Sequence, residues 1–284
     1  MRRLMEEVEA NPSISIRQLA GRLQISTGTV FNALREDLGL FPYKVSVRPH
    51  LNEGSSERRF QFAETLLGML QSGEITGKIW FTDEAHFHLN GYVNKQNYRI
   101  WGTENPHEVI EATLHPQRLS VFCAIGAGGI VGPFFTQERM TSQWYLGLLR
   151  DRVLPEMYGL GWVENFWYMQ DGARPHRTDE VFEFLQEHFG TRVIGLDYPN
   201  YAQGGVEWPP YSPDLNPCDF FLWGYIKDRV YRRAPADLVQ LEAAVVEAIR
   251  AIEPATLGRV FSSFQNRLQR VIVTRGRHFE NIVS

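Results

Sequence analysis

The first pattern along the chain is a helical one, in residues 10–40. Apolar residues recur there every three or four positions in two groups that are separated by a three-residue break. Ser26 or Thr27 can cap the second helix through a side-chain oxygen. The spacing predicts two short helices and a tight turn, with Ala20 at the close crossing, Ile25 anchoring the turn and Val30 in the core. The members of the two groups are Ile16, Leu19, Ala20 and Leu23, then Val30, Phe31 and Leu34.

Two short helices joined in this way are typical of a helix-turn-helix, whose second helix enters the major groove of DNA. That helix would present short polar side chains and one arginine, and basic residues of the following segment could contact phosphates. A small helical hairpin without a DNA role carries the same kind of solvated face, so this alternative stays open. The candidate DNA-binding residues are Ser26, Thr27, Thr29, Asn32, Arg35, Lys44 and Arg48.

The pattern then breaks into a segment punctuated by Pro, Gly and Ser, which predicts a linker leading into a new helix near Glu57 to Leu70. From Lys78 onward it changes again, to short apolar strands that alternate with helices. We therefore expect three parts, which cover residues 1–42, 43–75 and 76–284.

In the third part, two of the strands are separated by "AGG" and predict a hairpin, and Thr141 or Ser142 can cap the helix that follows it. Apolar strands alternating with amphipathic helices predict an α/β fold with a mixed sheet covered on both faces. The expected strands are 78–89, 119–126, 130–137, 164–171 and 191–199, and the expected helices are 141–158 and 178–189.

Composition narrows the class of protein. The chain has 284 residues, 43% of them hydrophobic, and no apolar run long enough to span a bilayer or to act as a signal peptide. Two cysteines exclude a disulfide framework, which indicates a reducing intracellular compartment. The net charge of −4 is uneven, since acidic residues gather in the middle of the chain and basic ones toward its end. Because a carboxylate-rich centre can bind cations, the net charge does not exclude a DNA partner.

Three aspartates in the third part fall where side chains can converge on one sheet. Asp83 lies inside the first strand, and Asp171 ends a later strand before the sharp turn "GARPH". Asp219 follows Asn216, a candidate helix cap, and Pro217, a residue suited to the first position of a helix. Each acid alone is equally well explained as a solvated or capping carboxylate.

If the three acids converge, their mutual repulsion calls for cations. Two Mg²⁺ ions about 4 Å apart would satisfy them and would hold the attacking and leaving oxygens of a phosphodiester. Asp214, five positions before Asp219, lies in the loop ahead of the cap, and we expect it to shape a turn.

Four motifs, in this order, resemble the mariner superfamily of cut-and-paste DNA transposases. They are "FTDEAHF", "NYRIWGTENP", "QDGARPH" and "YSPDLNPCDFFLWG". The helix-turn-helix and the segment "FPYKVSVRPHL" resemble the second half of that family's bipartite DNA-binding domain and its linker. Each motif alone is weak, but the four together cover most of the chain.

The resemblance implies a helix-turn-helix DNA-binding domain over 1–42, a linker and connecting helix over 43–75, and an RNase H-like catalytic domain over 76–284. Asp83, Asp171 and Asp219 would hold two Mg²⁺ or Mn²⁺ ions. The implied activity is cleavage at terminal inverted repeats and joining of the freed 3′-hydroxyl to target DNA at a TA dinucleotide. It also implies double-stranded DNA as partner, a homodimer, no membrane association, and a nuclear location in a eukaryotic host.

The chain departs from the family pattern in several places. Between Asp171 and Asp219 lie 47 residues, more than is usual, and a rule based on spacing alone would choose Glu207 as the third acid. We prefer Asp219, because Glu207 falls in a Gly/Pro loop with no helix to fix it. We interpret the segment before Asp219, residues 197–210, as an insertion that forms a mobile flap. Gly172 stands where many relatives have Asn, and the family's first helix-turn-helix is missing.

Two other functions compete with this one. The chain could be a domesticated or defective transposase that acts only as a sequence-specific DNA-binding protein. It could also be a zinc hydrolase using His86, His88 and His176, since His86 and His88 point the same way in a strand, together with Glu84 and opposite Asp83. The excess of carboxylates favours Mg²⁺ over Zn²⁺.

Overall fold

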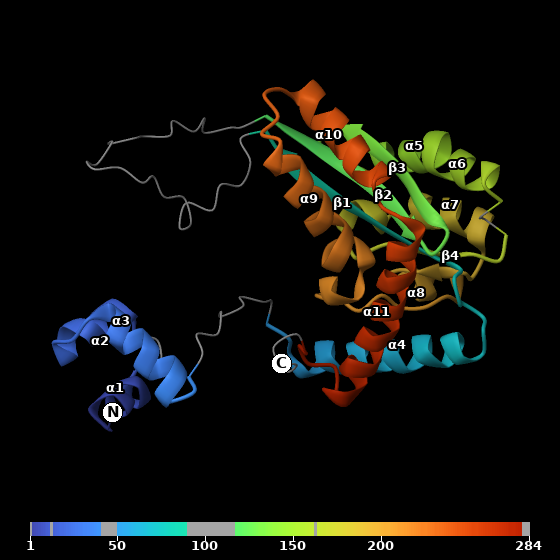
Figure 1. Cartoon of the computed structure of the whole chain (residues 1–284). Helices are drawn as coiled ribbons and strands as arrows, with labels where there is room; N and C mark the ends of the chain where they lie inside the picture. Colours follow the sequence, from blue (N-terminus) through green and yellow to red (C-terminus); the bar gives the residue numbers. More distant parts are fainter. Residues whose placement is uncertain (1, 12–13, 41–49, 90–116, 162–163, 280–284) are drawn as a thin grey trace. The chain divides into compact units, whose positions relative to one another are not determined.

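The computed structural model describes residues 2–11, 14–40, 50–89, 117–161 and 164–279 (Figure 1). By its internal contacts the chain divides into two compact units, Met1–Arg48 and Pro49–Ser284. Within the described residues, no helix has both the length and the apolar character that crossing a membrane requires.

The first unit contains α1 (Arg2–Ala10), α2 (Ile16–Leu23) and α3 (Thr27–Asn32), and α3 continues into the π-helical turn η1 (Ala33–Asp37). As expected, Ser26 caps α3: its Oγ accepts a hydrogen bond from the Thr29 backbone N–H at 3.0 Å. The α1 helix was not expected from the sequence, and it contributes Leu4 to the small core. The residues buried in this core are Leu4, Leu19, Ala20, Val30 and Ala33.

The role expected for Ile25 is wrong. Its side chain is 42% exposed, whereas Ala20 and Val30 are buried as predicted. The turn is fixed by the backbone instead, because Gln24 adopts a left-handed conformation (φ 56°) and the Ile25 N–H donates to the Ala20 carbonyl at 3.1 Å. The Ile25 side chain is therefore not needed to anchor the turn, and it faces solvent.

The second unit is built on one five-stranded mixed sheet with strand order β3-β2-β1-β4-β5. The strands β1, β2 and β3 form an antiparallel meander, while β4 pairs parallel to β1 and β5 pairs parallel to β4. The mixed sheet expected from the sequence is thus confirmed, although β4 and β5 are shorter than predicted. The strands are β1 (Ile79–His88), β2 (Arg118–Gly126), β3 (Gly129–Thr136), β4 (Trp167–Met169) and β5 (Val193–Ile194).

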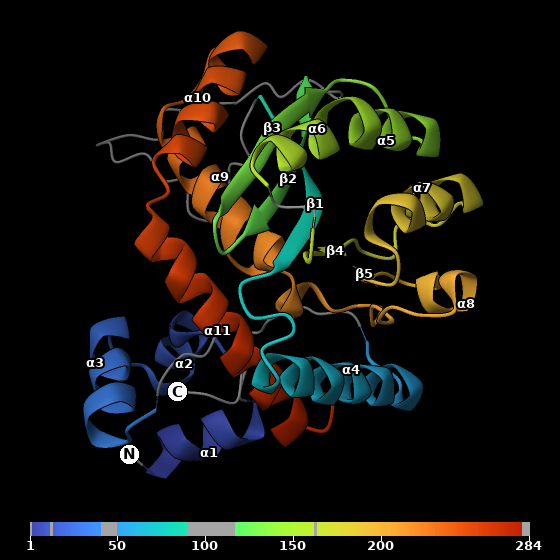
Figure 2. The same cartoon turned by 90° about the vertical axis from the view of Figure 1, so that its right-hand side faces the viewer.

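Helices cover both faces of this sheet (Figure 2). One apolar core joins the sheet to α4, α9, α10 and α11, and a second core on the other face joins it to α5, α6 and α7. Alternate residues of β1 supply the two cores, as the period of a strand requires: Phe81 and Phe87 belong to the first core and Trp80 to the second. The helices are α4 (Glu53–Gln71), α5 (Ser142–Leu148), α6 (Leu154–Gly159), α7 (Asp179–Phe189), α8 (Tyr198–Ala202), α9 (Trp223–Arg232), α10 (Leu238–Arg250) and α11 (Pro254–Val273).

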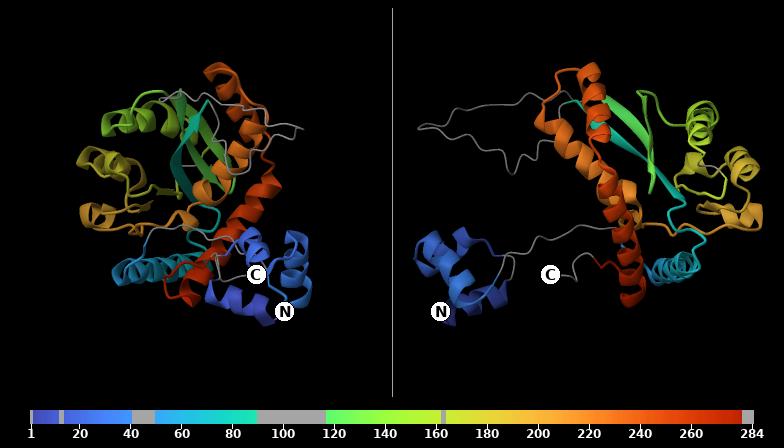
Figure 3. Two further views of the ribbon diagram at one scale, coloured as in Figure 1. Left: turned by 90° about the vertical axis from the view of Figure 1, so that its left-hand side faces the viewer. Right: turned by 45° about the vertical axis from the view of Figure 1, so that its right-hand side comes forward.

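Short helical turns complete the unit. The π-helical turn η2 (Leu149–Val153) joins α5 to α6, and Thr141 caps α5 as expected, accepting from the Trp144 N–H at 3.2 Å. The 3₁₀ turn η3 (Arg174–His176) follows β4, and the 3₁₀ turn η4 (Pro213–Leu215) precedes the π-helical turn η5 (Cys218–Leu222), which runs directly into α9. The η5 turn contacts β1, and η4 contacts α11. Figure 3 shows the long α11 helix, coloured red, running beside the sheet.

The segment before η4, interpreted from the sequence as a mobile flap, is packed into the unit. Tyr198 and Trp208 are buried, and the Trp208 ring contacts Phe62 of α4 edge to face at 5.3 Å between centroids. The backbone of Val206 forms a parallel bridge with Ile194 of β5. The flap interpretation is therefore wrong, because buried aromatic side chains and sheet hydrogen bonds hold this segment in place.

Candidate active site

Asp83 lies in the middle of β1, on the face of the sheet that α9 covers. Asp83 is 9% exposed, and its Oδ2 accepts a hydrogen bond from the Trp223 indole N–H at 2.8 Å. Burial raises the pKa of Asp83, and the nearby charges of Asp219 and Glu84 raise it further. A carboxylate in this position is unstable as an anion unless a cation approaches it.

Asp171 follows β4 and is held by the turn after it. Its Oδ1 accepts from the Ala173 N–H at 2.9 Å and from His176 Nδ1 at 2.7 Å. Burial acts to raise the pKa of Asp171, but the hydrogen bond and charge of His176 outweigh it, so that the pKa lies below its usual value. Asp171 is therefore the acid of the three that the protein itself keeps ionised.

His176 bridges two carboxylates, since its Nε2 lies 3.1 Å from Glu84 Oε1 while its Nδ1 contacts Asp171. Burial by itself lowers the pKa of His176, but the Glu84 charge and the Asp171 hydrogen bond raise it to about 10. The ring is then an imidazolium that donates from both nitrogens. It also stacks on Tyr145, with ring centroids 4.1 Å apart.

Asp219 is the second residue of η5, in the first turn of the helix that continues as α9. Asn216 fixes this start: its Oδ1 accepts from the Cys218 N–H at 3.0 Å, and the Cys218 thiol donates to the Phe81 carbonyl of β1 at 3.4 Å. The Asp219 residue is exposed to solvent. Desolvation of its carboxyl group and the charge of Asp171 nevertheless raise the pKa of Asp219 to about 6.

The three aspartates of the sequence prediction lie in β1, after β4 and at the start of η5, and they interact electrostatically. The charges of Asp219 and Asp171 raise the pKa of Asp83, and the charge of Asp171 raises the pKa of Asp219. Among the described residues, no three His, Cys, Asp or Glu side chains are gathered closely enough to hold a metal ion as they stand. The oxygen-only donors nevertheless fit a hard divalent cation, which would relieve the repulsion between Asp83 and Asp219.

Glu207, the acid chosen by spacing alone, belongs to a different neighbourhood. It lies in the loop after Val206 and accepts a hydrogen bond from the Asp197 N–H at 3.2 Å. Burial raises the pKa of Glu207, and Arg58 and Arg177 act against that rise. The two arginines thus offset the effect of burial only in part, and the pKa of Glu207 stays above its usual value.

The histidines of the zinc alternative do not gather. His86 is exposed, and its Nδ1 lies 2.9 Å from Ser120 Oγ of β2, while His176 is engaged by two carboxylates. The His88 backbone N–H donates to the Tyr231 hydroxyl at 3.1 Å. Among the described residues these side chains form no zinc site.

Five candidate DNA-binding residues of the first unit are exposed, at the cap of α3, along α3 and in η1. Ser26 and Thr29 hydrogen-bond to each other through their hydroxyls at 2.8 Å, and the Arg35 guanidinium lies 5.6 Å from the centroid of the Phe31 ring. The exposed members are Ser26, Thr27, Thr29, Asn32 and Arg35. Lys44 and Arg48 lie outside the described residues.

Sequence reasoning missed two side chains that shape this region. Trp223 donates a hydrogen bond to Asp83. Its position four residues after Asp219, on the same face of one helix, is the feature of the sequence that could have indicated this contact. Arg59 of α4 forms a buried ion pair with Asp214, which was expected only to shape a turn. No local pattern in the sequence indicates this second partnership.

Comparison with known proteins accounts for this arrangement. Residues 78–242 match the DDE superfamily endonuclease family, and residues 1–36 match the winged helix-turn-helix DNA-binding family. The chain belongs to the DDE superfamily of endonucleases. The match covers the three aspartates, from β1 through α9.

Transposases are among the relatives of this DDE chain. It is 23% identical over 271 residues to the transposable element Tc3 transposase of Caenorhabditis elegans, covering 94% of this chain and 76% of the relative. The fold is that of the Mos1 transposase paired-end complex with left transposon end, with a TM-score of 0.73 at 18% identity, over 98% of this chain and 79% of that one. The mariner Mos1 paired-end complex with Mg gives a TM-score of 0.70 at 18% identity, with 98% and 79% covered. The expected resemblance to the mariner transposases and the RNase H-like fold are thereby confirmed.

Proposed function

We propose that this chain is a DNA transposase that cleaves DNA at terminal inverted repeats and joins the freed 3′-hydroxyl to target DNA. The observation that carries the proposal is the pair Asp83 and Asp219, two carboxylates with raised pKa values that face each other within a DDE endonuclease domain. Acids destabilised in this way are typical of sites that receive cations.

Asp83, Asp171 and Asp219 would hold Mg²⁺ or Mn²⁺, as a two-ion set. When bound, two such ions activate the attacking oxygen and neutralise charge on the leaving oxygen of an in-line phosphoryl transfer. The mariner Mos1 structure with Mg is in line with this choice of metal. Among the residues of the chain, Trp223 orients Asp83 by its hydrogen bond. His176 orients Asp171 in the same way and keeps its carboxyl group ionised.

The first unit would recognise the DNA. We propose that the exposed residues Ser26, Thr27, Thr29, Asn32 and Arg35, with Lys44 and Arg48, contact bases and phosphates of the terminal repeats. We keep the division into 1–42, 43–75 and 76–284 as part of this proposal. A homodimer that acts at TA targets in the nucleus of a eukaryotic host completes it.

The decisive experiment is cleavage of a DNA end taken from the flanks of the encoding gene, with the full chain and with Mg²⁺, Mn²⁺ or EDTA. We expect nicking with either metal and none with EDTA. Binding without metal-dependent nicking would favour the alternative of a DNA-binding protein without catalysis.

A binding titration at several salt concentrations tests the first unit separately. Arg35→Ala should weaken binding to the repeat end and reduce the salt dependence of binding. Unchanged affinity and salt dependence in this variant would remove Arg35 from the interface.

A further inference from the structure

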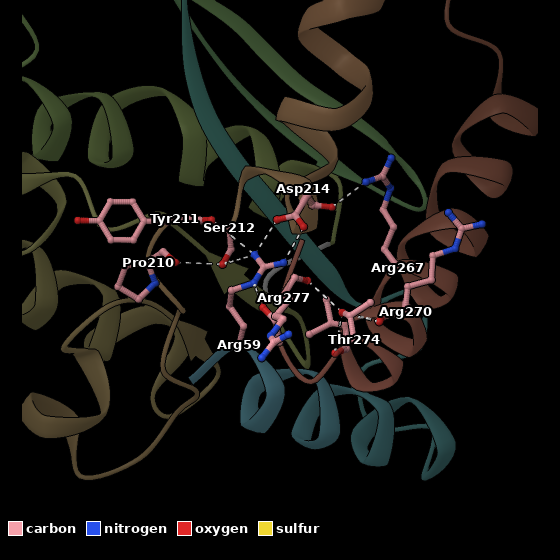
Figure 4. A network of polar contacts seen from close by, with 11 residues as sticks. Arg59, Pro210, Tyr211, Ser212, Asp214, Arg267, Arg270, Thr274 and Arg277 are labelled. Carbon is pink, nitrogen blue, oxygen red and sulfur yellow. Dashed lines mark hydrogen bonds and ion pairs between the residues drawn. The ribbon is translucent and has the colours of Figure 1, made fainter. Parts of the chain in front are cut away.

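A buried polar network lies next to the proposed site and is not used by it (Figure 4). The Arg59 guanidinium of α4 is 0% exposed and pairs with Asp214 of η4 through two parallel hydrogen bonds, at 2.7 Å from Nη1 and 2.6 Å from Nη2. It also donates from Nη1 to Ser212 Oγ at 2.8 Å and to the Tyr211 carbonyl at 3.5 Å, and from Nε to the Gly276 carbonyl at 2.8 Å. Arg59 thus joins three segments: the first helix of the unit, the loop before η5 and the turn after α11.

The loop that Arg59 holds is the one that leads to Asp219. Two residues after Asp214, the Asn216 side chain accepts a hydrogen bond from the Cys218 N–H at the start of η5, and its amide lies 3.5 Å from the Thr82 carbonyl of β1. Asp219 comes one turn later, and Thr82 is next to Asp83. The position of η4 is therefore transmitted, through three residues of chain, to one proposed metal-holding acid and to the strand that carries another.

A second arginine fixes the same loop from the other side. Arg267 of α11 donates to the Asp214 backbone carbonyl at 3.0 Å, and its guanidinium lies 4.2 Å from the centroid of the Phe220 ring, the residue after Asp219. Asp214 is held by arginines through both its side chain and its backbone. The start of η5 is thus fixed in orientation as well as in position.

Stability alone does not account for such a pair. Taking two charges out of water offsets most of their attraction, and replacing a buried ion pair by uncharged groups of similar size is often neutral for folding. What a paired guanidinium and carboxylate add is a fixed geometry, because two parallel hydrogen bonds allow one relative orientation.

We propose that Arg59 and Asp214 are positioning residues for the metal site, which set the start of η5 so that Asp219 faces Asp83. This inference rests on the proposed function, since it requires a divalent cation at these aspartates. The pair touches neither substrate nor metal, and it acts through η4 and Asn216.

The test separates positioning from folding by removing both charges at once. In the full chain, Arg59→Met with Asp214→Asn leaves no buried charge, so the melting temperature should stay near that of the wild type. Mn²⁺ binding without DNA, followed by electron paramagnetic resonance, should weaken by about 10- to 100-fold, the range found when groups that orient metal ligands are removed. A double variant that is stable and binds Mn²⁺ like the wild type would overturn the proposal.

Two further variants keep the test decisive. Arg59→Lys retains the charge but not the two parallel hydrogen bonds, so it should fold and bind Mn²⁺ more weakly than the wild type. If the double variant does not fold, wild-type Mn²⁺ affinity in Arg59→Lys overturns the proposal instead. The matched control is Arg233→Met with Glu247→Gln, which removes an exposed ion pair between the end of α9 and α10. This control should change neither the melting temperature nor the affinity for Mn²⁺.

Asp219→Ala separates a failure of the proposed metal site from a failure of the positioning role. If the wild type binds Mn²⁺ no better than Asp219→Ala, the metal site itself is wrong, and with it the positioning role. If the wild type binds better and the double variant equals it, only the role of Arg59 and Asp214 falls.

Discussion

Asp214 and Asp219 lie five residues apart, in the consecutive turns η4 and η5, and their surroundings are opposite in charge. Asp214 is buried and meets a guanidinium that matches both of its oxygens. Asp219 meets other acids, and their charges help to raise its pKa to about 6. The Asp214 carboxylate is paired with a guanidinium of the chain, whereas the charge of Lys227 offsets the raised pKa of Asp219 only in part.

Burial alone therefore does not identify the functional acids of a carboxylate-rich chain, because the groups around each acid decide its role. A buried acid that has its own cation is part of the framework, because removing either partner leaves an unpaired charge. An acid whose neighbours are other acids is a candidate for an external cation. Both kinds occur within the motif "SPDLNPCD", and sequence type alone does not separate them.

The largest effect on this comparison should come from Asp219→Ala. We expect metal-dependent nicking to fall by about three orders of magnitude or more, because a group that acts in the transition state is lost. Stability and DNA binding should remain, since the change relieves repulsion. Nicking assays on a repeat end, with urea unfolding alongside, measure both. Glu207→Ala is the control: it should nick normally, and a dead Glu207→Ala beside an active Asp219→Ala would reverse the assignment.

Asp214→Ala should show the converse behaviour. Leaving the buried Arg59 charge unpaired should lower the free energy of unfolding by about 3–5 kcal/mol. Equilibrium urea unfolding measures this directly. A variant as stable as the wild type would mean that water or another group replaces the carboxylate, and the contrast with Asp219 would disappear.

A smaller effect concerns pH in the metal-free protein. The pKa of Asp219 is about 6 in the folded chain against an ordinary 3.8, so the folded state binds this proton more tightly than the unfolded chain does. Its contribution to stability is therefore greatest below the ordinary value and is lost as the pH rises through about 6. Relative to Asp219→Asn, the urea midpoint of the wild type should fall with rising pH across this window. In Asp219→Asn this part of the slope should be missing; an identical slope in both would contradict the prediction.

The smallest effect should come from Arg233→Ala, which breaks an ion pair to Glu247 that is exposed on both sides. Solvent screens such pairs, so the urea midpoint should not change measurably. A clear loss of stability would show that exposure is a poor guide to which acids in this chain are structural.

The elements that carry the site follow from local patterns in the sequence. The β-rich composition of the segment from Lys78 predicts β1 with Asp83 inside it, and the caps at Ser26 and Thr141 are formed as expected. The placement of Asp219 in the first turn after Asn216 and Pro217 also follows from helix-start chemistry.

What could not be predicted are partnerships between distant residues. Arg59 and Asp214 are 155 positions apart, and Glu84 and His176 are 92 apart. Periodicity reports which face of an element is buried, but not which polar side chain of another element meets it. The same gap explains Ile25, where the backbone supplied the anchor that an apolar side chain was expected to give.

The hydrogen bond from Trp223 to Asp83 gives the site an optical reporter. Indole emission depends on what the ring N–H contacts, and here it contacts the carboxyl group that a cation would approach. The chain has seven tryptophans, so a Trp223→Phe difference spectrum isolates this one. Events at Asp83 can then be followed by fluorescence in real time, without a label and without DNA.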